Sequence, residues 1–390
     1  MFILEGPYVS GLLADTVAAS GLPVLDTSMA RRSLAGRDVM WLDDAAFSAA
    51  YRAAEAPRLY TNSENAIGWV MEHLAGTGLS RMVNVCKDKV AFRHFIADMH
   101  PGYGYREFRL GQADDFDPTS LRVPFVVKPA VGFFSLGVHV VARVEQWPAI
   151  AATLKSEARR HAATYPQHVL DFDRFIAEEV IPGDEYAVDA FYDADGRLTV
   201  VNVYGHLFAS ADDVSDRVYH TSVALVQRMA GPLGAYLQAF GRRAGLANFP
   251  VHAELRVAAD GAIGAIEVNP LRFGGWCATD LAHFAYGVNP YRCYLDGEHP
   301  DWDELAVSRA GVVTALVVAD VPAHVDLASI ESVDYQAFAA RFSRLLELRP
   351  VEYHRYPVFA FTFVQVPEDD QGELFAVVGA DLTQYLRMRG

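Results

Sequence analysis

The chain opens with short apolar segments on either side of an amphipathic one. FILEG (2–6) precedes GLLADTVAAS (11–20), and LPVLDT (22–27) follows. Apolar runs of this length predict buried strands, and the helical spacing between them predicts a crossover helix. We therefore expect a doubly wound α/β lobe over residues 1–83. The turn after its first strand lacks the G-x-G-x-x-G pattern, so we expect no dinucleotide site there.

The next stretch changes from a helical pattern to a strand-rich one. CKDKVAFRHFIADM (86–99) predicts one helix, which the Pro101-Gly102 pair ends. Three strands are predicted after it, with a helix from Gln146 to about His161 before the last: VPFVVK (123–128), GVHVV (137–141) and FIAEEVI (175–181). We assign residues 84–122 to a linker helix region and residues 123–183 to a small lobe.

Two later segments each place Asp-Gly between alternating apolar runs. They are EYAVDAFYDADGRLTVVNVYGHLF (185–208) and VHAELRVAADGAIGAIEVNP (251–270). Asp-Gly in this setting is the strongest short-range signal for a β-hairpin. An antiparallel core lobe is therefore expected over residues 184–300. Residues 301–390 are interpreted as a C-terminal subdomain, with strands at VVTALVVAD and VFAFTFVQV and a helix near 335–348.

Composition and charge narrow the class of protein. Hydrophobic residues make up 52% of the 390, but the chain has no apolar run of about 18 residues that could cross a bilayer. The formal charge of −16 disfavours nucleic acid as a partner, because duplex binding needs a basic surface. The start lacks the basic n-region of a secretory signal, and the 3 cysteines have no CxxC spacing. We expect a cytoplasmic protein without a membrane partner, and both monomer and homodimer remain open.

The second hairpin gathers carboxylates on one face. If Asp260-Gly261 is a two-residue turn, Glu254 lies opposite Glu267, and His252 lies opposite Asn269 on the same face. Two facing carboxylates repel unless a cation lies between them. Mg²⁺ prefers oxygen ligands and usually adds water and phosphate oxygens, so this face predicts a metal and a nucleotide. The alternative is a solvated strand face of ordinary acids.

The first hairpin has a similar polar face. With Asp195-Gly196 as a two-residue turn, Glu185 faces His206 and Asp189 faces Asn202. The opposite face is mostly apolar and predicts a core. The polar face is thus either a ligand-binding wall or simply exposed to solvent.

A third motif lies at the end of an apolar strand. Lys128-Pro129 is followed by Gly132-Phe-Phe-Ser135-Leu-Gly137. A lysine that closes a buried strand needs an anion, and a glycine-bearing turn with a serine hydroxyl can hold phosphate oxygens. The motif is not a Walker A loop, because no Gly-Lys-Ser/Thr follows. An ordinary turn beside a snorkelling lysine is the alternative.

The order of these motifs resembles the ATP-grasp superfamily. The likeness spans about residues 84–290 and rests on four motifs: Lys-Asp-Lys (87–89), Lys128-Pro with its Gly-x-x-Ser-x-Gly-Val loop, IAEEVIPGDE (176–185), and Glu254 followed by Glu267-Val-Asn269-Pro. It implies an ATP-grasp fold with an N-terminal α/β lobe, a small lid lobe and an antiparallel-sheet core lobe. It also implies ATP and Mg²⁺ as cofactors, with Mn²⁺ as an alternative ion.

The resemblance implies roles at the phosphate end of the nucleotide. Lys89 and Lys128 are expected to bind phosphates, with Lys87 as an alternative to Lys89. A loop containing Gly132, Ser135 and Gly137 is expected to close over the triphosphate, although Phe133 and Phe134 make it bulkier than usual. The expected magnesium ligands are Glu254, Glu267 and Asn269.

Other roles follow from the same resemblance. The adenine and ribose contacts are expected from Glu178, Glu179, Val180, Ile181 and Glu185. Arg272 resembles the arginine that steadies an acyl phosphate and its tetrahedral successor, although here Leu271 separates it from the Asn-Pro pair. The expected catalytic residues are Arg272, Lys128 and His206, with His252 as a second candidate for the general base.

The implied activity is that of an ATP-dependent carboxylate-amine ligase. It forms an amide or peptide bond through an acyl phosphate, releases ADP and phosphate, and takes a small carboxylate and an amine as substrates. The segment RFGGWCATD (272–280) resembles the amino-acid ligase branch, and residues 216–220 are candidates for the acceptor pocket. The alternatives are an ATP-grasp carboxylase or nucleotide-pathway ligase, and a non-catalytic ATP-binding sensor.

Overall fold

The computed structural model of the chain describes residues 1–131, 137–161, 172–208, 217–322 and 324–389. Of the residues named above, Gly132, Phe133, Phe134, Ser135 and Asp216 lie outside this described part. No helix in the described part is long and apolar enough to span a bilayer. All three cysteines are buried free thiols.

The N-terminal lobe is built on a four-stranded parallel sheet with the order β3-β2-β1-β4. Ser10 begins α1 because its side chain accepts a hydrogen bond from the Leu13 N–H, and Gly21 ends the helix at φ +63°. The predicted α/β start is therefore confirmed. The elements are β1 (Phe2–Ile3), α1 (Gly11–Ser20), β2 (Val24–Leu25), α2 (Ser28–Ser33), β3 (Trp41–Leu42), α3 (Asp44–Ala53), β4 (Tyr60–Thr61) and α4 (Ile67–His73).

Two helices connect this lobe to the small lobe. They are α5 (Gly78–Lys87) and α6 (Lys89–Ile96). The prediction of one continuous helix over 86–99 is wrong, because the chain breaks at Asp88. The Asp88 carboxylate accepts from the N–H groups of Val90 and Ala91 and so begins a new helix.

The small lobe is a four-stranded antiparallel sheet with the order β5-β8-β6-β7. Its strands are β5 (Tyr105–Arg109), β6 (Phe125–Pro129), β7 (His139–Val141) and β8 (Arg174–Glu179), and α7 (Trp147–His161) belongs to the same lobe. Trp147 and Leu154 of α7 pack on Phe125 and Phe175 of the sheet. The strands and the helix predicted for this lobe are confirmed.

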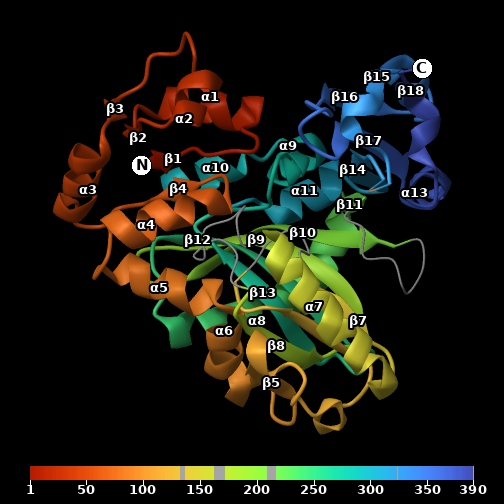
Figure 1. Cartoon of the computed structure of the whole chain (residues 1–390). Helices are drawn as coiled ribbons and strands as arrows, with labels where there is room; N and C mark the ends of the chain where they lie inside the picture. The colour runs from red at the N-terminus through yellow and green to blue at the C-terminus, as the bar shows by residue number, and fades with distance from the viewer. Residues whose placement is uncertain (132–136, 162–171, 209–216, 323, 390) are drawn as a thin grey trace.

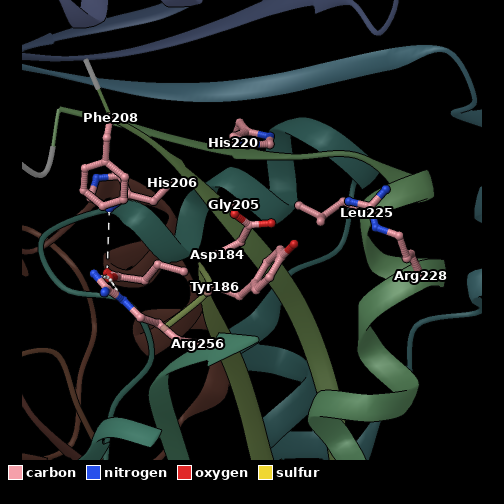
Figure 2. A pocket seen from close by; sticks show the side chains of 11 residues that line it. Asp184, Tyr186, Gly205, His206, Phe208, His220, Leu225, Arg228 and Arg256 are labelled. Atoms are coloured by element: carbon pink, nitrogen blue, oxygen red, sulfur yellow. Dashed lines mark hydrogen bonds and ion pairs between the residues drawn. The ribbon is translucent and has the colours of Figure 1, made fainter. Parts of the chain in front are cut away.

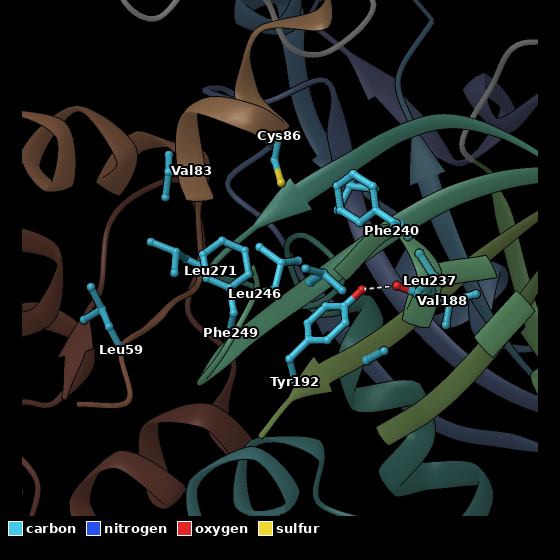
Figure 3. Packing of buried hydrophobic residues seen from close by; sticks show 14 of the residues in the cluster. Leu59, Val83, Cys86, Val188, Tyr192, Leu237, Phe240, Leu246, Phe249 and Leu271 are labelled. Carbon is cyan, nitrogen blue, oxygen red and sulfur yellow. Dashed lines mark hydrogen bonds between the residues drawn. The ribbon is translucent and has the colours of Figure 1, made fainter. Parts of the chain in front are cut away.

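An eight-stranded antiparallel sheet forms the centre of the molecule (Figure 1), with the order β13-β12-β9-β10-β11-β14-β17-β16. Helix α8 (Val223–Ala244), which the sequence reading did not predict, packs on one face, and Figure 3 shows Leu237 and Phe240 of this helix near Val188. The strands are β9 (Asp184–Tyr192), β10 (Leu198–Leu207), β11 (Val218–Thr221), β12 (Phe249–Val257), β13 (Ile263–Pro270), β14 (Val312–Asp320), β16 (Leu345–Pro350) and β17 (Val358–Pro367).

The C-terminal residues extend this sheet. Strand β14 pairs with β11, and β17 and β16 follow in order. The helix predicted near 335–348 is mostly wrong: α12 covers only Tyr335–Ala339, and residues 345–350 pair with β17 because its edge offers backbone partners. The other elements are α9 (Leu281–Tyr286), α10 (Pro290–Arg292), α11 (Trp302–Ser308), β15 (Ile330–Val333), α13 (Gly372–Val378) and β18 (Leu386–Met388).

Both predicted hairpins form, but their turns are longer than expected. In the second hairpin, the Ala258 N–H donates to the Ala262 carbonyl, so three residues lie between them, and only Gly261 has a positive φ, of +86°. This shifts the register by one residue, and a bulge next to Glu254 shifts it back. The first hairpin repeats this arrangement, with Gly196 in the turn and a bulge after Val200. Two compensating irregularities thus preserve the predicted pairs.

Candidate active site

Polar side chains lie in three rows on one face of the central sheet. Strand register places Arg256 opposite Glu185, Glu254 opposite Ala187, and His252 opposite Asp189. Directly opposite residues share a face, and so do every second residues along one strand. We name the rows after their β9 members: the Glu185 row, the Ala187 row and the Asp189 row. The Ala187 row continues to Glu267 on β13 and Tyr204 on β10. The Asp189 row continues to Asn269 on β13 and Asn202 on β10.

The Ala187 row carries two of the three predicted metal ligands, and Asn269 lies in the neighbouring Asp189 row. Glu254 and Glu267 lie directly opposite each other, and their side chains are 31% and 24% exposed. Lys89 Nζ lies 3.2 Å from Glu267 Oε2, and Asn269 Nδ2 donates to Glu267 Oε1 at 3.0 Å. Burial by itself would raise the pKa of the Glu267 carboxyl, but Lys89, Lys128 and the Asn269 amide hold it well below its usual value. The Glu267 carboxylate is therefore available as an anion.

This donor set fits a hard divalent cation. The two facing carboxylates and the amide oxygen of Asn269 are the ligands that Mg²⁺ prefers. In the described part of the chain, no group of three or more His, Cys, Asp or Glu side chains could hold a metal ion by itself. A metal bound here would thus keep positions for water and phosphate oxygens, as Mg²⁺ does in nucleotide sites.

Lys128 and Glu178 form a buried ion pair between neighbouring strands of the small lobe. Lys128, at the end of β6, pairs with Glu178 of β8, and both side chains are less than a tenth exposed. Arg93 of α6 also pairs with Glu178, and its Nη2 donates to the Ile266 carbonyl at 3.1 Å. Burial would raise the pKa of Glu178, but Arg93 and Lys128 lower it to about 2. Arg93 thus joins the sheet of the small lobe to β13, a role that the sequence did not suggest.

Glu64, from the N-terminal lobe, lies next to the predicted site residue Arg272. Its carboxylate pairs with Lys87 and lies 3.0 Å from Arg272 Nη2. Burial would raise the pKa of Glu64, but Lys87 and Arg272 lower it to about 2. Arg272 is 9% exposed, and it follows Leu271, which takes a left-handed φ of +61°. Glu64 was not among the predicted residues, because nothing near it in the sequence indicates its distant partner.

The residues predicted to contact adenine lie at the C-terminal end of β8 and directly after it. The Glu179 carbonyl accepts from the Tyr103 hydroxyl at 2.6 Å, and a carbonyl oxygen can accept a second bond. The Val180 N–H donates to the Pro124 carbonyl at 3.3 Å. Ile181 lies against β13 at Gly264, where a Cβ would come within 2.5 Å of its Cγ2. This segment therefore contacts the central sheet.

The Glu185 row borders a pocket of about 580 Å³. Arg256 Nη2 lies 2.9 Å from Glu185 Oε2, and His206 Nδ1 lies 3.9 Å from Glu185 Oε1. The His206 ring stacks on Tyr219 with centroids 4.5 Å apart. Figure 2 shows His206 and Arg256 on one side of the strands, and Tyr186 and Arg228 on the other. The pocket therefore reaches around the ends of β9 and β10.

Asp189 is fully buried in the third row, and four groups donate to it. They are His252 Nδ1 at 2.7 Å, the Gly274 N–H at 2.8 Å, Thr279 Oγ1 at 3.1 Å and the Tyr204 hydroxyl. A buried carboxylate is costly unless such donors surround it. Asp189 thus fixes both His252 and the loop that carries Arg272.

The predicted residues fall into two groups in the structure. One group contains Glu254, Glu267, Asn269, Lys89 and Arg272. It forms because the charges of Lys89 and Arg272 both attract the carboxylates of the Ala187 row. Lys128 and Glu178 adjoin this group: burial lowers the pKa of Lys128, and the nearby charge of Lys89 lowers it as well. Glu185 and His206 lie apart, in the row beside the pocket. Gly137 has a φ of +71°, and the rest of its predicted phosphate loop lies outside the described residues.

Comparisons with known proteins agree with this architecture. Residues 121–280 match the family model of the ATP-grasp domain. No curated protein matches the chain significantly.

Solved structures with the same fold cover nearly the whole chain. The L-amino acid ligase from Bacillus licheniformis is 16% identical, with a TM-score of 0.69 over 99% of this chain and 97% of its own. N5-carboxyaminoimidazole ribonucleotide synthetase from Thermotoga maritima is 12% identical, with a TM-score of 0.62 over 100% and 98%. Phosphoribosylglycinamide synthetase from Anaerococcus prevotii is 12% identical, with a TM-score of 0.58 over 99% and 98%. The chain thus has the ATP-grasp fold expected from its sequence.

Proposed function

From this fold and site, we propose that the protein is an ATP-dependent carboxylate-amine ligase. It joins a small carboxylic acid or amino acid to an amine through an acyl phosphate, and it releases ADP and phosphate. The observation that carries the proposal is the facing pair Glu254 and Glu267, with Lys89 at 3.2 Å from one of them. A metal bound between these carboxylates would neutralise charge on the transferred phosphoryl group.

In the first step, a substrate carboxylate oxygen attacks the γ-phosphorus of ATP. The new P–O bond forms as the bond to ADP breaks, so ADP leaves with the electron pair. Lys89 and Lys128 attract the phosphate oxygens, and Glu254, Glu267 and Asn269 hold the Mg²⁺ or Mn²⁺ ion. Gly132, Ser135 and Gly137 are proposed to close over the triphosphate.

In the second step, the amine nitrogen attacks the acyl carbon. The C–N bond forms, the C–O bond to phosphate breaks, and the amine gives up one proton. Arg272 faces the negative charge that builds on the tetrahedral intermediate. Lys87, Arg272 and Glu64 together carry one net positive charge, which favours an anion beside them.

The other residues of the proposal bind the nucleoside. Glu178, Val180, Ile181 and the Glu179 backbone are proposed around adenine, and Glu185 at the ribose. The Glu185 side chain borders the 580 Å³ pocket, which gives a sugar room. His206, next to Glu185, is proposed as one candidate for the proton acceptor.

The test incubates the protein with ATP, Mg²⁺ and a panel of amino acids and small carboxylic acids, with hydroxylamine as the amine. We expect ADP, phosphate and a hydroxamate, all dependent on one carboxylate. AMP and pyrophosphate would contradict the proposal. ADP formation driven by bicarbonate would favour the carboxylase alternative, and no turnover with any acid would favour the sensor.

A further inference from the structure

One buried histidine in the site is held in a fixed orientation. His252 Nδ1 lies 2.7 Å from Asp189 Oδ1, and His252 is 7% exposed. Three other groups donate to this carboxylate, so it also accepts from the ring, and Nδ1 carries the proton. In the neutral ring, Nε2 is then left as an acceptor.

This acceptor nitrogen points along β12 toward the metal ligands. His252 Nε2 lies 4.0 Å from Glu254 Oε1, which is too long for a hydrogen bond. The same Asp189 carboxylate accepts from the Gly274 N–H at 2.8 Å, two residues after Arg272. Asp189 therefore fixes the histidine and the arginine loop relative to each other.

We infer that His252 Nε2 binds the incoming amine of the proposed ligase reaction. The inference rests on the proposed function and adds the position of its second substrate. An amine that donates one N–H to Nε2 has its lone pair free to face an acyl carbon beside Arg272. Asp189 is a positioning residue in this arrangement, because it sets which ring nitrogen accepts.

The test separates the two half-reactions. Acyl phosphate formation is measured as hydroxamate production at high hydroxylamine concentration. Amide formation is measured by product analysis with an amino acid as the amine. Hydroxylamine is small, uncharged near neutral pH and strongly nucleophilic, so it depends less on a binding group. Wild type must give hydroxamate; if it gives none, the proposed function fails rather than this inference.

The informative variant is His252→Asn. Its amide nitrogen can replace Nδ1 as donor to Asp189, but no atom reaches the position of Nε2. We expect amide formation to fall by about tenfold or more, while hydroxamate formation stays within about twofold. His283→Gln, on an exposed histidine of α9, is the control and should change neither rate. Equal rates of amide formation in His252→Asn and wild type would overturn the inference.

Asp189→Asn supplies a second, independent variant. The new amide can donate to Nδ1, which turns Nε2 into an N–H donor that repels an amine N–H. Amide formation should again fall more than hydroxamate formation, with Asp369→Asn at an exposed position as control. If the variant does not fold, His252→Asn decides alone. A parallel loss of both reactions in His252→Asn, with a raised Mg²⁺ requirement, would mean that His252 binds the metal and would also overturn the inference.

Discussion

Glu64 Oε1 and Arg272 Nη2 lie 3.0 Å apart, although the first belongs to the N-terminal lobe and the second to the loop after β13. The neighbouring backbone is joined as well, because the Thr61 N–H donates to the Leu271 carbonyl at 2.8 Å. Leu271 is fully buried at a φ of +61°, which is costly for a branched residue. The N-terminal lobe therefore helps to hold Arg272 in place.

Replacing Glu64 with Gln should impair acyl transfer more than folding. Arg272 and Lys87 lose their shared carboxylate, so Arg272 is held less firmly in its proposed position beside the acyl phosphate. We expect hydroxamate formation to fall by about tenfold or more, which corresponds to about 1.4 kcal/mol or more in the barrier. Glu72→Gln, on an exposed side chain of α4, should keep the wild-type rate. A Glu64→Gln enzyme with normal kinetics would show that the ion pair is dispensable.

The sequence was sufficient for elements whose evidence is local. The Asp-Gly hairpins could be predicted because their pairing depends on nearby residues, and the pairing of Glu254 with Glu267 followed. The turn geometry could not, because the bulge beside Glu254 that restores the register has no signature in the sequence.

Contacts between residues that lie far apart in the sequence could not be predicted from it. Each of three residues, Glu64, Arg93 and Asp189, contacts a partner far away in the sequence, at separations of 208, 85 and 63 positions, respectively. Each is an ordinary charged residue in its own segment. Likewise, residues 345–350 form a strand because β17 offers them an edge. Such features arise from tertiary contacts, which local pattern does not encode.

Arg93 should be essential for stability. It is 3% exposed and contacts Glu178 of the small lobe and the Ile266 carbonyl of β13. Arg93→Met leaves Glu178 with only Lys128, and removing one partner of a buried pair costs about 3 to 5 kcal/mol. The unfolding midpoint should therefore drop by several degrees. Arg93→Lys keeps the charge but loses the forked geometry, so an intermediate drop is expected. An unchanged midpoint in Arg93→Met would refute this role.

Acid should destabilise the protein partly through Glu178. Its pKa is lowered from 4.5 to about 2 in the folded state, against the effect of burial, by Arg93 and Lys128. The contribution to folding is therefore present above about pH 4.5 and is lost as the pH falls toward 2. A pKa difference of this size corresponds to about 3 to 4 kcal/mol. Denaturant unfolding at several pH values should show a shallower acid dependence in Glu178→Gln than in wild type. Identical slopes would contradict the assigned shift.

Glu267→Gln should abolish turnover and leave the fold intact. The change removes one of two facing anions and weakens the attraction for Lys89, which lies 3.2 Å away. Mn²⁺ binding in the presence of a non-hydrolysable ATP analogue, followed by electron paramagnetic resonance, should weaken in parallel. Normal turnover, or Mn²⁺ affinity equal to that of wild type, would remove Glu267 from the metal site.

An acyl phosphate intermediate requires that one oxygen atom pass from the substrate carboxylate to the released phosphate. A carboxylate substrate labelled with ¹⁸O should be converted with ATP and Mg²⁺, and the released phosphate analysed by mass spectrometry. If the carboxylate attacks the γ-phosphorus and the amine then displaces phosphate, each phosphate carries one ¹⁸O atom from the substrate. Unlabelled phosphate, or label recovered in AMP, would rule out the acyl phosphate.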